Sequence, residues 1–165
     1  MTNESKASSL NFMDYLAKIV EFVMISLTII MIALVTYQVF ERYILHYTPP
    51  WSEELAVYLM IWFGIIGIAA GVRRNSHMSL EYFANKMPKS LQDFLKLFNY
   101  VIMLLYTCTL IYEGINMVEL TMSQKSPAIG LPVGYVYLAL PVSAVLMVLF
   151  IIEALFKEIK KRRNT

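Results

Sequence analysis

The sequence PPWSEELAVYLMIWFGIIGIAAGVRRNSH, residues 49–77, decides the fold of this chain. Its middle part, from Leu55 to Val72, is 18 residues without a charge. That length is close to the minimum that crosses a hydrocarbon core of about 30 Å at about 1.5 Å per helical residue. Ser52 and the two glutamates after it are typical of a helix start, and the arginine pair after Val72 is typical of a cytoplasmic helix end. The stretch therefore predicts a membrane-spanning helix and its direction.

The composition places the chain among the integral membrane proteins. Of 165 residues, 58% are hydrophobic and 16% are charged, which is too apolar for an ordinary soluble domain. We therefore expect a single helical membrane domain over residues 1–165. Cys108 is the single cysteine, which excludes an internal disulfide and a thiolate zinc site. We expect it to be buried as a small hydrophobic side chain.

The hydrophobic pattern predicts an all-α protein with four transmembrane helices. The expected spans are approximately 19–41, 52–72, 92–121 and 132–156. Residues 79–87, between the second and third spans, are amphipathic but too short to cross, with Leu80, Phe83 and Met87 on one apolar face. This segment predicts a short helix that lies in the membrane interface. Within the fourth span, Pro141 is expected to kink the helix.

Lysine and arginine are distributed unequally between the two sides that four spans define. With both termini on the inner side, that side holds 12 of these residues, and the outer side holds only Arg42 and Lys125. Because positive residues are enriched in cytoplasmic segments, the distribution predicts that both termini are cytoplasmic. The basic C-terminal residues indicate contact with the lipid bilayer, and nothing indicates nucleic acid.

Three polar residues of the spans have more than one interpretation. A carboxylate in a membrane helix is a candidate functional group, so Glu21 could serve a small exporter. The simpler interpretation is that Lys18 or interfacial water satisfies Glu21. Glu113 and Asn116 share one face of the third span and, by residue count, lie near its outer boundary. They either face a partner or reach water, and the count favours water.

Small residues form a stripe on the second span. Gly64 and Gly67 are three residues apart, and Gly71 continues the same side. Small side chains allow another helix to approach closely, because packing rather than water exclusion drives helix association in lipid. The stripe is therefore a candidate contact either with a partner subunit or with another helix of this chain, and the sequence leaves both open.

The sequence offers little chemistry for catalysis. His46 and His77 are expected on opposite sides of the membrane, so they cannot ligate one haem. No nucleophile with a base, metal-binding cluster or phosphate-binding loop can be assembled, so we expect no enzyme, cofactor or metal site. The class of protein that fits best is a membrane scaffold that functions only together with partner proteins. The alternative is a self-sufficient, small multidrug-type proton-coupled exporter that uses Glu21.

The most specific motifs lie around the second span and before the fourth. The first set is Arg42-Tyr43, Trp51-Ser52-Glu53-Glu54, Gly64, Gly67, Arg73, His77 and Met87-Pro88. It resembles the small, DctQ-like membrane subunit of tripartite ATP-independent periplasmic (TRAP) transporters. The run SPAIGLPVGY, residues 126–135, with Pro141 beyond it, is similar to the family's entry to its fourth helix. The resemblance covers roughly residues 40–142.

This resemblance implies a part of a secondary transporter that imports an organic acid across the bacterial inner membrane with a sodium gradient. In such transporters a soluble periplasmic binding protein captures the substrate, and a large membrane subunit moves it by an elevator-like motion. The small subunit packs against the large one as a static scaffold and helps to dock the binding protein. The resemblance assigns no substrate, sodium or cofactor residues to this chain. Overall likeness favours sialic acid over other carboxylates, such as dicarboxylates and sugar acids.

Two sets of residues are candidates for this scaffold role. Groups of the outer loops are candidates for docking the binding protein: Arg42, His46, Trp51, Glu53, Glu54 and Lys125. Interfacial groups are candidates for anchoring the chain at one depth in the bilayer: Trp51, Arg73, Arg74, Leu80, Phe83 and Met87.

Overall fold

The computed structural model describes residues 3–75 and 89–163, and every regular element in these ranges is a helix. The elements are α1 (Asn3–Phe40), the π-helical turn η1 (Glu41–Leu45), α2 (Pro50–Asn75), α4 (Lys89–Thr121), α5 (Gly134–Tyr137) and α6 (Ala139–Arg163). The expected interfacial helix, with Leu80, Phe83 and Met87, lies outside the described residues, as does His77.

Four stretches of helix are long and apolar enough to cross a membrane. They are Phe12–Ile44, Pro50–Arg74, Leu97–Thr121 and Gly134–Lys157. The all-α membrane fold with four spans is thereby confirmed. The largest difference from the expected bounds is at the first helix, which already begins at Asn3. The polar residues 1–18 contain no Gly or Pro, so no helix-breaking residue precedes the first span.

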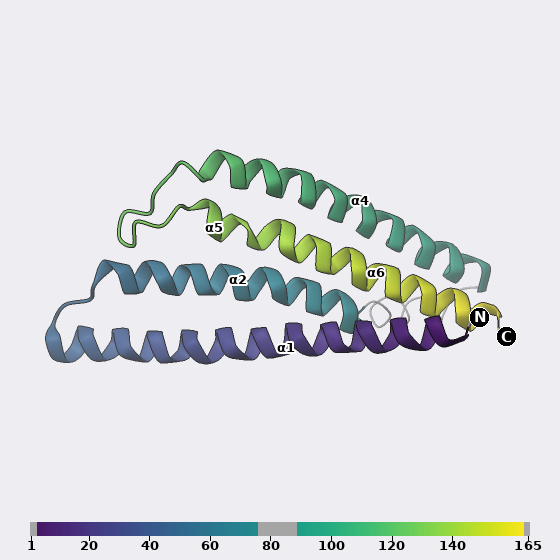
Figure 1. Ribbon diagram of the computed structural model, residues 1–165, viewed down its shortest axis with the longest axis horizontal. Coiled ribbons are helices and arrows are strands. Elements are labelled where there is room, and N and C mark those ends of the chain that lie inside the picture. The colour runs from purple at the N-terminus through teal and green to yellow at the C-terminus, as the bar shows by residue number, and fades with distance from the viewer. Residues whose placement is uncertain (1–2, 76–88, 164–165) are drawn as a thin grey trace.

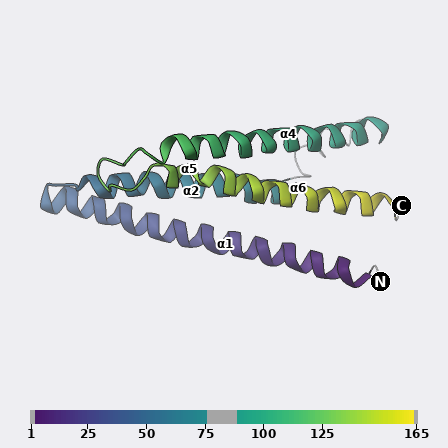
Figure 2. The same ribbon diagram turned by 45° about the horizontal axis from the view of Figure 1, so that its top comes forward.

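The long helices lie side by side in the order α1, α2, α6 and α4 (Figure 1). The helix α6 lies between α2 and α4, whereas α1 packs mainly on α2 and diverges from the other helices toward its N-terminal end (Figure 2). Both termini lie at one end of the molecule, which we call the terminal end (Figure 1). Residues 46–49 and 122–133 lie at the opposite end, which we call the loop end.

Buried side chains explain why α6 is central. Phe150 packs with Ala17, Val20 and Ile66 from α1 and α2. The next residue, Ile151, packs with Tyr100 of α4 and with Ala154. These two adjacent residues of α6 therefore pack against helices on opposite sides of it. Cys108, in contrast, is exposed on α4, so the expectation that it is buried is wrong for this chain by itself.

Contacts between helices determine which residues lie at the same depth. The Ser143 hydroxyl donates to the carbonyl oxygen of Ile65 at 2.7 Å, so the middle of α6 lies beside the middle of α2. A Cβ atom added to Gly114 would lie 3.0 Å from Cδ of Pro141, so α4 approaches α6 closely at that proline. Trp51 and Arg73, at the two ends of α2, are about 33 Å apart along the helix. This separation matches the thickness of a hydrocarbon core.

In the fourth span, Leu138 separates α5 from α6 but keeps a helical backbone conformation, with φ of −56° and ψ of −24°. Pro141 has no N–H group, so the carbonyl of Tyr137, four residues earlier, loses its helical donor. The kink that the sequence predicts at Pro141 stays a prediction.

Candidate functional site

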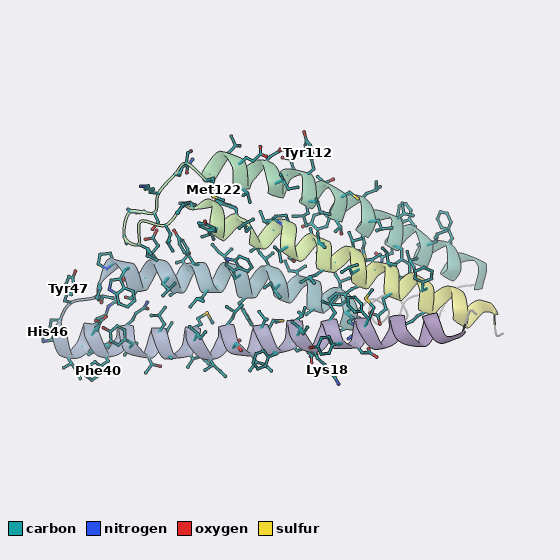
Figure 3. The ribbon with its side chains drawn as sticks, viewed as in Figure 1. Lys18, Phe40, His46, Tyr47, Tyr112 and Met122 are labelled. Carbon is teal, nitrogen blue, oxygen red and sulfur yellow. The ribbon has the colours of Figure 1, made fainter. Side chains whose placement is uncertain are left out.

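Most of the proposed docking residues are exposed at the loop end. Arg42 and Glu53 form an ion pair with 3.5 Å between Nη2 and Oε1, and their side chains are 68% and 58% exposed. His46 is exposed and has a left-handed backbone conformation, with φ of 54°. Figure 3 shows His46 and Tyr47 at the tip of the molecule. Lys125 is exposed in the other loop at this end.

Glu54 has a different environment from the other docking candidates. Its Oε2 atom accepts hydrogen bonds from the backbone amides of Ala128 and Ile129, at 3.0 and 3.1 Å. Its Oε1 atom accepts from the Tyr58 hydroxyl at 2.8 Å. Charge-assisted hydrogen bonds of this kind are stronger than neutral ones. Glu54 therefore fixes the loop at residues 126–130 to the first turns of α2.

The loop that Glu54 holds is also closed by its own backbone. The amide of Ser126 donates to the carbonyl of Leu131 at 2.9 Å, and the amide of Gly130 donates to the carbonyl of Ser126 at 3.0 Å. Gly130 has φ of 75°, which other residues rarely adopt. The Ser126 hydroxyl accepts from the amide of Ile129 at 3.2 Å. The run SPAIG thus forms a compact turn with a fixed shape.

The first turn of α2 is attached to α1. The helix begins at Pro50, so Ser52 lies within its first turn instead of before it. The Ser52 hydroxyl donates to the carbonyl of Pro49 at 2.9 Å. The backbone carbonyl of Ser52 accepts a hydrogen bond from the side-chain amide of Gln38 at 2.6 Å. The centres of the Trp51 and Tyr37 rings are 6.2 Å apart, and Trp51 is 42% exposed. This geometry suits an interfacial tryptophan.

The π-helical turn buries a carboxylate, Glu41, that was not among the residues predicted to be functional. Glu41 is only 4% exposed, and its Oε2 atom has no hydrogen-bond partner within the described part of the chain. A π-helical turn shifts the direction of the side chains that follow it, and such turns are frequent at functional sites.

Arg73 links three helices at the terminal end. Its Nε atom donates to Oε2 of Glu153 on α6 at 3.0 Å, and its Nη2 atom also pairs with Asp14 on α1. Glu153 is buried, and its Oε1 atom also pairs with Nζ of Lys157 at 2.6 Å. The Arg73 guanidinium also lies 5.6 Å from the centre of the Phe150 ring, within the range of a cation–π contact. The arginine is therefore part of a packed ionic cluster.

Glu21 pairs with Arg74 on α2, at 2.6 Å from Oε1 to Nη2. The expected partner, Lys18, points away from the bundle (Figure 3). Because Arg74 marks the terminal end of α2, Glu21 lies near a membrane boundary and not at the midplane. This position does not favour the exporter alternative, which needs an accessible carboxylate in the transport path.

Only one glycine of the predicted stripe contacts another helix within the described chain. A Cβ atom at Gly67 would lie 3.5 Å from Cε of Met24 on α1, so Gly67 serves packing within the chain. Gly64 and Gly71 have no such atom within 4 Å. Contact of these two glycines with a partner subunit remains a proposal.

The glycines in closest contact with a neighbouring segment are Gly114 and Gly134, which are not part of the predicted small-residue stripe. Gly114 on α4 lies against Pro141, as described above. A Cβ atom at Gly134 would lie 2.8 Å from Sδ of Met122 and 3.0 Å from a backbone oxygen of α4. The signal that could have found them is the proline-rich entry to the fourth span, where the chain turns back on itself. No group of three or more His, Cys, Asp or Glu within residues 3–75 and 89–163 is arranged to hold a metal ion.

Comparison with known families identifies the chain. The family model described as "Tripartite ATP-independent periplasmic transporters, DctQ component" matches residues 31–161. The chain belongs to the DctQ family. The resemblance inferred from the motifs is therefore confirmed, and the chain is a multi-pass membrane protein of the TRAP small permease type.

Individual DctQ relatives agree with this assignment. A TRAP transporter small permease protein of Haemophilus influenzae is 31% identical over 146 residues, covering 88% of this chain and 90% of the relative. The sialic acid TRAP transporter small permease protein SiaQ of Vibrio cholerae is 27% identical, covering 85% and 81%. The sialic acid TRAP transporter permease protein SiaT of Haemophilus influenzae is 28% identical over 86% of this chain, which spans only 23% of that relative.

Proposed function

We propose that this chain is the small scaffold subunit of a sodium-coupled, binding-protein-dependent importer of an organic acid. Its partners are a large membrane subunit, against which it packs, and a soluble periplasmic binding protein, which it helps to dock. Sialic acid is the first substrate to test, because two of the similar permeases carry that name. The proposed location is the bacterial inner membrane, with the terminal end cytoplasmic and the loop end periplasmic.

The observation that carries the docking role is the fixed loop end. Glu54 joins the loop at residues 126–130 to α2, while Arg42 and Glu53 remain exposed beside it. A rigid surface with exposed charges is suited to a transient encounter, because such charges change the association rate more than the final affinity. The positions of the described cations support the orientation, since Arg73, Arg74 and Lys157 gather at the terminal end.

The SiaT permease supports the existence of a larger partner. This chain is similar to about a quarter of SiaT, so a region like this one occurs there in one polypeptide with a much larger remainder. Permanent fusion of two regions in one protein supports association of the corresponding separate chains. We therefore place the transport path in the large subunit.

The test is uptake of labelled sialic acid into proteoliposomes that contain both membrane subunits, with an inward sodium gradient and increasing amounts of binding protein. We expect Arg42→Glu and Lys125→Glu to raise several-fold the concentration of binding protein that gives half-maximal uptake, and to leave maximal uptake nearly unchanged. Lys18→Glu, an exposed charge reversal at the other end of the molecule, is the matched control.

A double exchange separates docking from local structure. If the Arg42–Glu53 pair has only a structural role, the variant R42E/E53R restores the pair and should restore uptake. If Arg42 contacts the binding protein, the exchange should not rescue the defect. Unchanged uptake at limiting binding protein in all of the loop-end variants would overturn the docking role. Uptake by the small subunit alone would overturn the scaffold assignment.

A further inference from the structure

A ridge of polar side chains runs along the face of α4 that points away from α6. It consists of Glu113, Asn116 and Glu119, spaced three residues apart, and we call it the polar ridge. Residues at this spacing are neighbours on a helix surface. Gly114, on the opposite face, is buried against α6, whereas Glu113 and Glu119 are exposed. Tyr112, beside the ridge, is 66% exposed and points away from the bundle (Figure 3).

The deepest member of this ridge lies near the middle of the membrane. Gly114 lies beside Pro141, and Ser143, two residues further on, bonds to Ile65. Glu113 is therefore level with about residues 63–64 of α2. At about 1.5 Å per residue, this is roughly 18 Å from Trp51 and roughly 15 Å from Arg73. Glu113 is thus deeper than the residue count of α4 indicated, because the loop at residues 122–133 extends beyond the end of α4 (Figure 1).

This depth makes contact with lipid unfavourable. The side chain of Glu113 has no hydrogen bond or ion pair with any residue that the structure describes. A charged side chain at the centre of a membrane helix costs about 3 kcal/mol on insertion scales, so such residues usually face protein or a water-filled path. Glu21 and Glu153, the acidic residues of the spans that lie at the terminal end, both have cationic partners, whereas Glu41 lies near the loop end. Glu113, which is far from both ends of the bundle, therefore still requires a partner.

We propose that the polar ridge packs against the large membrane subunit, which supplies a cationic or other hydrogen-bond donor to Glu113. This inference rests on the proposed function, since it needs a second membrane protein. The soluble binding protein cannot reach this depth, and neither can lipid headgroups. A symmetric dimer of this chain through the same face would bring Glu113 and Glu119 toward identical acidic groups, which repel one another. The partner must therefore carry the complementary charge.

The first arm of the test is site-specific crosslinking in the native membrane. A photoreactive amino acid replaces Tyr112 or Asn116 in the chain co-expressed with the large subunit of its own transporter. The control positions are Ile29 and Ile32, which are exposed on α1. We expect a crosslink to the large subunit from both α4 positions, at least fivefold stronger than from either control position.

The second arm measures how much large subunit is recovered when the small subunit is purified in mild detergent. We expect Glu113→Lys to reduce recovery about tenfold and Glu113→Gln to reduce it less, because glutamine still accepts a hydrogen bond. Glu53→Lys, an equal charge change at the exposed loop end, should leave recovery unchanged.

The controls distinguish failure of this inference from failure of the proposed function. In one outcome the wild-type chain recovers the large subunit, α4 gives no crosslink above the controls, and Glu113→Lys recovers the normal amount. The polar ridge then does not contact the large subunit, and the inference is overturned. If α4 crosslinks only to a second copy of this chain, the inference is also overturned. If the wild-type chain recovers no large subunit, the proposed function fails and the inference fails with it.

Discussion

Two adjacent glutamates in the first turns of α2 have different environments. Glu53 is 58% exposed and pairs only with Arg42, at 3.5 Å. Glu54 accepts three hydrogen bonds, two of them from backbone amides that come 74 and 75 residues later in the chain. An exposed ion pair contributes little to stability, whereas hydrogen bonds to a carboxylate contribute more. Within the motif Trp-Ser-Glu-Glu, the first glutamate is therefore suited to a partner and the second to the fold.

Removal of Glu54 should loosen the loop at residues 126–130 without unfolding the helices. A hydrogen bond to a charged group contributes about 1.5–3 kcal/mol. We therefore expect Glu54→Ala to increase amide hydrogen exchange at Ala128 and Ile129 by at least about tenfold. Exchange in the middle of α6 should not change. Glu53→Ala is the control and should leave the loop protected, and equal exchange in the two variants would contradict the assignment.

Helix α4 approaches its neighbour through a glycine that is not part of the predicted small-residue stripe. Gly114 has Pro141 Cδ at 3.0 Å and Leu140 Cβ at 3.2 Å from the position of an added Cβ atom. Both neighbours belong to the first turn of α6, where the proline restricts the backbone. The helix pair therefore cannot accept a larger residue at this position by moving one flexible side chain.

Replacement of this glycine should destabilise the chain by overpacking. We expect Gly114→Val to lower the free energy of unfolding of the purified subunit in detergent by about 1–3 kcal/mol. Gly64→Val is the matched control, because no atom of another described helix lies within 4 Å of an added Cβ atom there, so its effect on the isolated subunit should be small. The measurement is a denaturation curve in detergent. A larger loss in the Gly64 variant would show that the helix positions described here are wrong.

At the scale of the whole molecule, α2 is joined along its length to the loop at residues 126–130 and to α6. We call this contact the α2–α6 seam, and its bonds are Glu54 to the amides at 128–129, Ser143 to Ile65, and Arg73 to Glu153. These bonds lie at the loop end, in the middle and at the terminal end. The two bonds to α6, in the middle and at the terminal end, determine the depth of α6 relative to α2.

The ion pair of the seam, Arg73 with Glu153, should contribute more to stability than the exposed pair of Arg74 with Glu21. Glu153→Ala leaves Arg73 partly buried without its main partner, which typically costs about 3 kcal/mol or more. Glu21→Ala removes the exposed pair with Arg74, which typically contributes less than about 1 kcal/mol. Thermal unfolding of the purified subunit in detergent should show a clearly lower Tm for the first variant only. Equal Tm values would mean that Asp14 and water replace Glu153 fully.

Much of the fold is readable from the sequence, because apolar length and charge position act on each helix separately. Those signals predicted the four spans and the family motifs. The depth of one helix relative to another is a different matter, since it depends on contacts between residues distant in the chain. For this reason the sequence predicts Lys18 or interfacial water, and not Arg74, as the partner of Glu21, and it does not indicate that Glu54 holds a loop.

The α2–α6 seam also has a consequence for the order of folding. Helices α1 and α2 form one hairpin of neighbouring helices, and α4 with α5 and α6 forms another, so the contacts within each hairpin are nearer in sequence than those of the seam. Membrane helices insert first and associate afterwards, and nearer contacts form faster. The seam should therefore close last. A chain with a defective seam would be inserted with normal topology but as two undocked hairpins, sensitive to protease and without the assembled surfaces that partners need.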